Sequence, residues 1–215
     1  MHQPSLTAPP DKQAQKMRAY YAFHARIYDA TRWSFLFGRK QLIKKIPLDK
    51  NGQWHIAEVG CGTGYNLEKL AAVFPNARLS GIDVSENMLQ KAGERLHKFG
   101  DRVELLHRPF APGKTNFDSP PDLIIFSYAL TMMNPGWQKM LEQAKAELRP
   151  GGCIAVVDFH DSPFLFFKKH MGGHHVKMDG HLLPVLQNDF RTAAAKTAPA
   201  YGGLWQYFYF IGQKD

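Results

Sequence analysis

The sequence predicts a doubly wound α/β fold, in which helices cover both faces of a mostly parallel sheet. Two observations predict it. From about residue 54 onward short apolar segments alternate with amphipathic ones, and the first apolar segment runs into a glycine-rich turn. With 215 residues, of which 44% are hydrophobic and 21% charged, the chain can bury one sizeable core. We therefore expect one α/β domain with an N-terminal appendage.

Each expected element follows from its local pattern. Short apolar runs are typical of buried strands, and apolar residues at three- and four-residue spacing are typical of amphipathic helices. The expected strands are WHIAEVG at 54–60, ARLSGID at 77–83, RVELLHR at 102–108, DLIIFSY at 122–128, CIAVVDF at 153–159 and the aromatic GLWQYFYFIGQK at 203–214. The expected helices are 12–33, 34–46, 66–74, 86–99 and 135–148. The two helices before the first strand are expected to form a lid.

Positive charge is concentrated at the N-terminal end of the chain. The formal net charge is +8; residues 1–50 hold ten Lys and Arg against three Asp, whereas residues 51–215 hold 17 against 16 acids. Such a basic segment suits a nucleic acid, an anionic membrane surface or a solvated face. The chain has neither an apolar signal core at its start nor an apolar run of about 18 residues. We expect a cytoplasmic protein that spans no membrane, with Cys61 and Cys153 as reduced thiols.

A glycine-rich loop follows the first expected strand. In AEVGCGTGYN, Gly60, Gly62 and Gly64 are spaced G-x-G-x-G ahead of a helix, so a ligand can approach the main chain and free helix N–H groups. The spacing differs from the G-x-G-x-x-G dinucleotide fingerprint, and an acid, Glu58, precedes it. Asp83 ends the second strand, where its carboxylate can accept hydrogen bonds from both ribose hydroxyls. The loop and this carboxylate together indicate a ribose-containing ligand.

These segments resemble the class I S-adenosylmethionine-dependent methyltransferases. EVGCGTG and GIDVSENML are similar to the first two motifs of that family, and LRPGG is similar to its turn before the fifth strand. The resemblance implies a Rossmann-like seven-stranded sheet with an antiparallel last strand, S-adenosylmethionine as cofactor and S-adenosylhomocysteine as product. It divides the chain into a disordered tail with cap helices at 1–50 and a methyltransferase domain at 51–215. By position, the implied cofactor-binding residues are Glu58, Gly60, Gly62, Thr63, Gly64, Asp83, Val84, Met88, Pro109, Phe110 and Ser127.

Methyl transfer from a sulfonium requires chiefly that the acceptor lone pair be aligned with the methyl–sulfur bond. An amine acceptor must also lose its proton, so a neighbouring group must accept it. Strand carboxyl ends line the ligand crevice of such sheets, which makes Tyr128 and His160, with Asp161 beside it, candidates for this role. Tyr28 is a further candidate from the lid. Packing is the alternative interpretation of the tyrosines.

Histidines crowd one stretch after the fifth expected strand. Their spacing matches no familiar zinc pattern, and GGHH is typical of a loop. We therefore expect no metal and favour a loop that faces the surface or the substrate. The residues concerned are His160, Asp161, His170, His174, His175 and His181.

Two segments combine aromatic residues with Lys and Arg: TRWSFLFGRKQLIKKI at 31–46 and SPFLFFKKHM at 162–171. This composition is typical of helices that lie in the interface of an anionic bilayer. Because both segments are expected to cap the acceptor pocket, they favour an acceptor presented by a membrane. The alternative is an ordinary lid with inward-packed aromatics and solvated lysines. The candidate substrate or membrane residues are Arg32, Trp33, Arg39, Lys44, Lys45 and Phe166.

HARIYDATRWSFLFGR, FSYALTMM and WQYFYFIGQK resemble the N-methyltransferases of betaine-lipid synthesis. This resemblance spans nearly the whole chain. It implies three methylations of the amino group of diacylglyceryl homoserine, at the inner face of the membrane, with a second lipid-synthesis enzyme as a partner. It also implies pairing of Arg32 or Arg39 with the homoserine carboxylate, and an aromatic pocket for the cationic product that would be lined by Tyr20, Tyr21, Tyr28 and Tyr128.

Other acceptors remain open. A phosphatidylethanolamine N-methyltransferase would share the cofactor site and the membrane segments, and a soluble small molecule is a further alternative. An RNA methyltransferase is disfavoured, because residues 51–215 are nearly neutral, and no nucleic acid partner is expected. A cofactor-binding regulator without activity is the remaining class.

Overall fold

The structure is a computed structural model that describes residues 36–114, 116–133, 135–173 and 176–215. The chain divides into two units, Met1–Phe35 and Leu36–Asp215, and all described residues lie in the second. The expected helix at 12–33 and three candidate residues, Tyr28, Arg32 and Trp33, therefore lie outside the described residues, as do His174 and His175.

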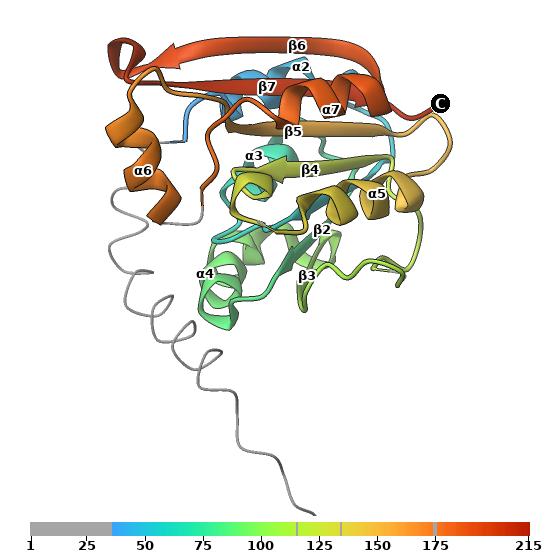
Figure 1. The fold of residues 1–215 in the computed structure, drawn as a ribbon. Coiled ribbons are helices and arrows are strands. Elements are labelled where there is room, and N and C mark those ends of the chain that lie inside the picture. The colour runs from blue at the N-terminus through green and yellow to red at the C-terminus, as the bar shows by residue number, and fades with distance from the viewer. Residues whose placement is uncertain (1–35, 115, 134, 174–175) are drawn as a thin grey trace, which may run out of the picture. The chain divides into compact units, whose positions relative to one another are not determined.

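The second unit contains one seven-stranded sheet with the order β3-β2-β1-β4-β5-β7-β6 (Figure 1). Neighbouring strands from β3 to β5 run parallel, whereas β7 is antiparallel to both β5 and β6. The strands are β1 (His55–Val59), β2 (Arg78–Asp83), β3 (Val103–His107), β4 (Leu123–Ser127), β5 (Cys153–Phe159), β6 (Arg191–Ala200) and β7 (Trp205–Gln213). This order and orientation confirm the expected seven-stranded, mostly parallel sheet with an antiparallel last strand.

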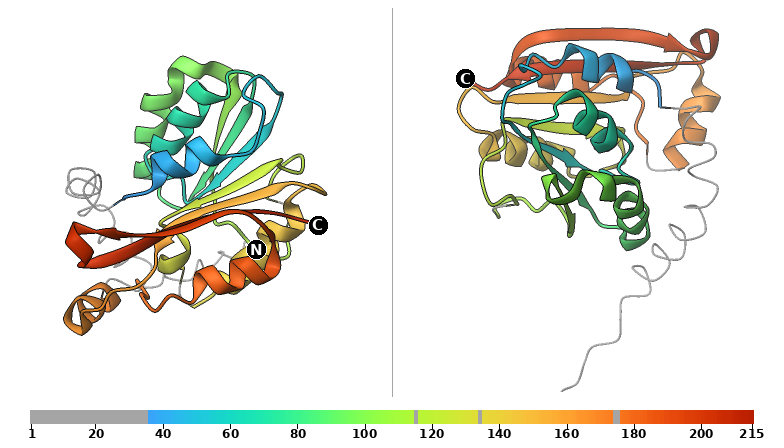
Figure 2. Two further views of the ribbon diagram at one scale, coloured as in Figure 1. Left: turned by 90° about the horizontal axis from the view of Figure 1, so that it is seen from above. Right: turned by 180° about the vertical axis from the view of Figure 1, so that it is seen from behind.

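Helices cover both faces of the sheet (Figure 2). One core cluster contains side chains of α2, α3 and α4, and the other contains side chains of α5 and α7. The α-helices are α2 (Arg39–Lys45), α3 (Tyr65–Val73), α4 (Glu86–Leu96), α5 (Trp137–Glu147), α6 (Leu165–Gly173) and α7 (Leu182–Asp189), and the 3-10 helices are η1 (His97–Arg102), η2 (Leu130–Met132) and η3 (Tyr201–Gly203). The two clusters confirm the doubly wound arrangement.

The sequence does not predict β6, α6 or α7. β6 is alanine-rich and largely exposed, so it lacks the apolar alternation by which a strand is found. It is held by pairing with β7 along its length, a contact that local sequence does not specify.

Helix α2 uses its apolar side for the core. Leu42 and Ile43 are 1% and 7% exposed, and the helix packs against β5, β7 and α3. Leu42, Ile43 and Ile46 are therefore not available to lipid, which argues against α2 as an interfacial helix, although Phe37 before it is 36% exposed. Lys44 and Lys45 remain exposed. The spacing of apolar residues in this segment is that of an amphipathic helix, and such helices usually face a core.

Candidate cofactor and acceptor site

The glycine-rich loop joins β1 to α3. Gly60, Gly62 and Gly64 have φ values of 72°, 53° and 72°, a left-handed conformation that favours glycine. A Cβ on Gly64 would lie 2.7 Å from Leu96 Cδ1, so a side chain there would have to displace that methyl group. The loop is tied to β2 because the main-chain N–H groups of Gly60 and Cys61 donate to the carbonyl of Ile82, at 2.8 and 3.0 Å. The expected backbone turn is therefore present.

Asp83 lies at the carboxyl end of β2, beside this loop. Its Oδ2 accepts a hydrogen bond from the N–H of Gly62 at 2.8 Å, and its Oδ1 accepts one from the N–H of Ser85 at 2.9 Å. Parallel pairing of β1 and β2 brings the loop and the carboxylate to the same edge of the sheet. The residue expected to hold the ribose also fixes the loop.

Glu58 is buried at the end of β1. Its Oε1 accepts a hydrogen bond from Nδ2 of Asn66 at 2.7 Å, which links the strand to the first turn of α3 across the glycine loop. Thr63, within the loop, is also buried. These two residues support the loop.

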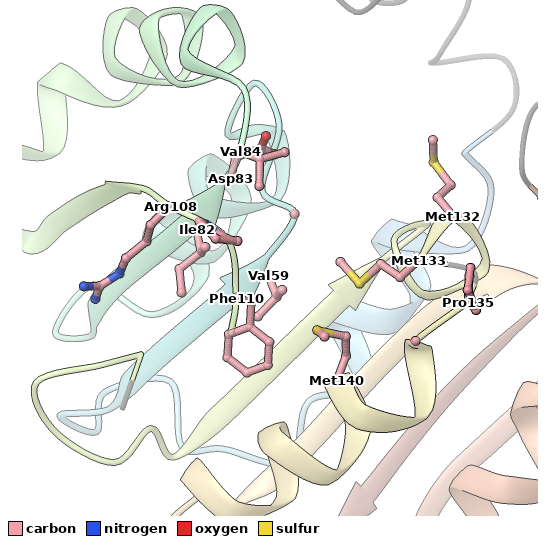
Figure 3. A pocket seen from close by; sticks show the side chains of 13 residues that line it. Val59, Ile82, Asp83, Val84, Arg108, Phe110, Met132, Met133, Pro135 and Met140 are labelled. Carbon is pink, nitrogen blue, oxygen red and sulfur yellow. The ribbon is translucent and has the colours of Figure 1, made fainter. Parts of the chain in front are cut away.

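A pocket of about 380 Å³ opens beside the loop (Figure 3). Five of the expected cofactor residues line it: Gly60, Asp83, Val84, Pro109 and Phe110. Phe110 lies on one side, and the side chains of Met133 and Met140 lie on the other. An apolar slot with a carboxylate at its rim fits a nucleoside, with the base between apolar side chains and the ribose at Asp83.

The other expected cofactor residues lie outside the lining of this pocket. Met88 is buried in α4, where its N–H bonds to Ser85, and Ser127 is buried at the end of β4. Sequence reasoning missed Met132, Met133 and Met140. A signal was present, because three methionines occur within ten residues of LTMMNPGWQKM, and flexible thioethers fit irregular binding surfaces.

Arg39 lies near the cofactor loop. Its guanidinium carbon is 4.2 Å from the ring centroid of Tyr65, the residue that follows Gly64 and begins α3. Its Nε also donates to the carbonyl of Leu36 at 3.2 Å. The guanidinium of Arg39 therefore lies over the ring of Tyr65 in α3. Its expected pairing with an acceptor carboxylate stays a prediction.

Tyr128 follows β4 with a left-handed φ of 55°. Its hydroxyl donates to the carbonyl of Phe37 at 2.8 Å, and its ring packs edge-on against Phe159. Burial, reinforced by the Asp158 carboxylate, raises the pKa of Tyr128 far above its ordinary value. A phenol that stays protonated and donates its proton elsewhere cannot accept a proton from an amine. The hydrogen bond and the raised pKa argue against Tyr128 as the proton acceptor, and the hydrogen bond holds the β4 loop to the segment before α2.

Asp158 on β5 is fully buried and was not expected. Its carboxylate accepts hydrogen bonds from Thr131 Oγ1 at 2.5 Å, the Thr131 N–H at 3.2 Å and the Phe159 N–H at 2.8 Å. Burial raises the pKa of Asp158 to about 6, although the hydrogen bonds from Thr131 act in the opposite direction. These bonds join β5 to the η2 turn, whose Met132 lines the pocket.

His160 follows β5 and stays a predicted base. Its main chain is fixed on both sides, because its N–H donates to Gln206 and its carbonyl accepts from Gly180, each at 2.8 Å. Burial holds the pKa of His160 below its ordinary value, so the imidazole is neutral at pH 7. Among the described residues its buried Nδ1 has no hydrogen-bond partner. A neutral imidazole with such a nitrogen is able to accept a proton.

Within the described ranges no group of three or more His, Cys, Asp or Glu has a metal-binding arrangement. No helix among those residues is both long enough and apolar enough to cross a bilayer.

Comparison with known proteins shows what this chain is similar to. A family model described as a methyltransferase domain matches residues 56–152. Trans-aconitate 2-methyltransferase of Paracidovorax citrulli is 34% identical over 116 residues, which is 54% of this chain and 42% of that protein. The crystal structure of 1,6-didemethyltoxoflavin-N1-methyltransferase from Burkholderia thailandensis is similar with a TM-score of 0.71 at 15% identity, over 98% of this chain and 92% of that chain. The N-methyltransferase NodS of Bradyrhizobium japonicum, bound to S-adenosylhomocysteine, gives 0.67 at 18% identity, over 82% and 85% of the two chains.

The chain spans about two fifths of the length of the curated relatives that it matches. The family match ends at Gly152, so it includes the glycine loop, Asp83 and Phe110 but not β5, α6 or the β6–β7 hairpin. The solved structures confirm the fold. Residues 56–152 therefore match a methyltransferase domain, and the chain has the fold of the solved methyltransferases.

Proposed function

We propose that this protein transfers a methyl group from S-adenosylmethionine, held by the glycine loop and the neighbouring pocket. The observation that carries the proposal is the hydrogen bond from the Gly62 N–H to Asp83, because it joins the glycine loop to the carboxylate that we propose binds the ribose. The cofactor supplies an electrophilic methyl group on a sulfonium. The residues of the chain then have to orient the acceptor, exclude water and take up one proton.

For the acceptor, we propose the amino group of a lipid headgroup, diacylglyceryl homoserine, methylated up to three times to a betaine lipid. The resemblance of three segments spread from the N-terminal to the C-terminal part of the chain supports this choice. The exposed aromatic start of α6 supports a membrane-borne acceptor. In this proposal His160 accepts the amine proton, because its lowered pKa keeps the imidazole unprotonated at neutral pH.

A second candidate is a small soluble acid. Several trans-aconitate 2-methyltransferases match this chain at 31–36% identity, which favours an acceptor that carries carboxylates. The family match ends before β5, so this evidence concerns mainly the cofactor-binding part. A carboxylate acceptor arrives without a proton to remove, so replacing His160 would affect it little.

The test is mass spectrometry of the products after incubation with S-adenosylmethionine and one acceptor at a time. The acceptors are diacylglyceryl homoserine, phosphatidylethanolamine and trans-aconitate, and the Asp83→Ala protein is the control for enzyme-dependent transfer. Gains of one, two and three methyl groups on the homoserine lipid alone would support the proposal. A single methyl group on trans-aconitate alone would replace it with the second candidate, and methylation of phosphatidylethanolamine alone would change the headgroup.

A further inference from the structure

Three consecutive bulky apolar side chains lie in solvent where α6 begins. Phe164, Leu165 and Phe166 are 44%, 66% and 67% exposed, whereas Phe167, the next residue, is 8% exposed. We call Phe164, Leu165 and Phe166 the α6 patch. Half of the large hydrophobic residues that are exposed in the described part of the chain belong to it. Contiguous exposed apolar surface of this kind marks interaction sites.

The main chain holds the α6 patch outward. Ser162 is 2% exposed; its hydroxyl donates to the carbonyl of Leu204 at 2.7 Å and accepts from the N–H of Phe164 at 3.1 Å. The N–H of Phe167 then donates to the carbonyl of Phe164 at 3.1 Å. With Phe167 filling the inward position, the helical period directs Leu165 and Phe166 away from the core, whereas Phe164, three residues before Phe167, is less exposed. The exposure is therefore built into the start of the helix.

Two lysines follow the α6 patch in the helix. Lys168 pairs with Asp161 at 2.5 Å, and Lys169 is exposed on the next position of the helix. Tyr201, half exposed in the η3 turn, belongs to the hairpin to which Ser162 is bonded (Figure 1). Residues 36–215 carry 22 Lys and Arg against 17 Asp and Glu. A lipid surface with anionic headgroups complements an apolar patch on a cationic unit.

We propose that the α6 patch docks this protein on an anionic lipid surface, with Phe164, Leu165 and Phe166 inserted at the headgroup boundary. This inference rests on the proposed lipid acceptor and assigns the docking to α6 instead of α2. The two segments have similar composition, but Leu42 and Ile43 of α2 are buried. Because α6 begins six residues after β5 ends, docking there brings the bilayer to the carboxyl edge of the sheet, where the cofactor loop also lies.

The experiment measures sedimentation of the full chain with vesicles of phosphatidylcholine alone or with phosphatidylglycerol added. We expect binding to the anionic vesicles, and we expect the Phe164→Ser/Phe166→Ser protein to need about tenfold more lipid for half-maximal binding. The matched Phe164→Leu/Phe166→Leu protein keeps the apolar character and should bind like the wild type. Lys169→Glu should weaken binding more than Lys139→Glu, the same change at an exposed site on α5. Thermal unfolding of each variant checks that the fold is retained.

Equal vesicle binding of the serine and wild-type proteins would overturn the proposal. A wild-type dimer in light scattering that the serine variant splits, without a change in vesicle binding, would assign the α6 patch to a second copy of the chain and also overturn it. Vesicle binding needs no methyl transfer, so Asp83→Ala should bind vesicles normally. Normal docking without methylation of any lipid would reject the proposed acceptor alone, and methylation of detergent-dispersed lipid without docking would reject the α6 patch alone.

Discussion

Two parts of this molecule depend on the sequence in different ways: the cofactor end, which is the glycine loop with Asp83, and the acceptor end, which is α2, α6 and the segments around β5. At the cofactor end, three left-handed glycines and one carboxylate are fixed by main-chain hydrogen bonds between neighbouring strands. At the acceptor end, two segments of almost the same composition behave in opposite ways, since Leu42 of α2 is 1% exposed and Leu165 of α6 is 66% exposed. Local residue types thus determine a backbone turn, whereas the burial of an amphipathic segment depends on distant partners.

The strongest test of the cofactor end is Asp83→Ala. The carboxylate is expected to bind the ribose hydroxyls and it already holds Gly62, so its loss removes at least two charge-assisted hydrogen bonds. We expect S-adenosylhomocysteine to bind at least about 100-fold more weakly, or about 3 kcal/mol, in isothermal titration calorimetry. Asp118→Ala is the control, because that carboxylate is 78% exposed and pairs only loosely with Arg78. Equal affinity of the Asp83 variant and the wild type would remove Asp83 from the cofactor site.

Asp158, the buried acid on β5, provides a test of the acceptor end. The pKa of Asp158 is raised from 3.8 to about 6, so the folded protein keeps this proton at pH values where the unfolded chain has lost it. The free energy of unfolding should therefore fall as the pH rises from about 4 to 6.5, by up to about 3 kcal/mol from this group. Asp158→Asn cannot titrate and should lack that part of the fall. Urea unfolding at a series of pH values measures both slopes, and identical slopes would show that Asp158 titrates normally.

Gly64 and Gly93 show the difference between a position that requires glycine and one that does not. Gly64 has a φ of 72°, and a Cβ there would lie 2.7 Å from Leu96 Cδ1, whereas a Cβ on Gly93, inside α4, would meet nothing within 4 Å. We expect Gly64→Ala to lose about 2 kcal/mol of unfolding free energy, and Gly93→Ala to gain about 0.5 to 1 kcal/mol, because alanine favours a helix. Thermal melts compare the two proteins directly. If Gly64→Ala melts at or above the wild-type temperature, the steric argument at the loop fails.

The sequence predicts the cofactor end well because its constraints are local. Gly60 to Gly64 need a backbone conformation that few other residues adopt, and Asp83 follows from the strand that places it. The sheet order also follows, because alternating strands and helices permit few parallel arrangements. The three pocket methionines carry only a weak signal, since methionine in a sequence is more often a core residue.

The acceptor end is less predictable because its contacts are remote in the chain. Tyr128 looks reactive at a strand end until its hydrogen bond to Phe37, 91 residues away, is known. Asp158 looks like any acid in CIAVVDF until β7 and η2 enclose it. β6 has no apolar alternation, and its strand pairing is visible only once β7 is in place.

The smallest expected effect concerns the exposed lysines of α2. Lys44→Glu/Lys45→Glu reverses two charges without touching the buried Leu42 and Ile43, so stability should change by less than about 0.5 kcal/mol. Each lysine near an anionic surface contributes about 1 kcal/mol at most, and that contribution decreases with salt. We therefore expect a severalfold loss of binding to anionic vesicles at low salt that disappears at high salt, whereas the loss caused by serine at Phe164 and Phe166 persists. Vesicle sedimentation at two salt concentrations distinguishes the effect of the charge reversal from that of the serine changes. The distinction between α2 and α6 fails if the charge reversal removes as much vesicle binding as the serine changes at both salt concentrations. The lysines of α2 would then dominate docking, although the apolar side of that helix is buried.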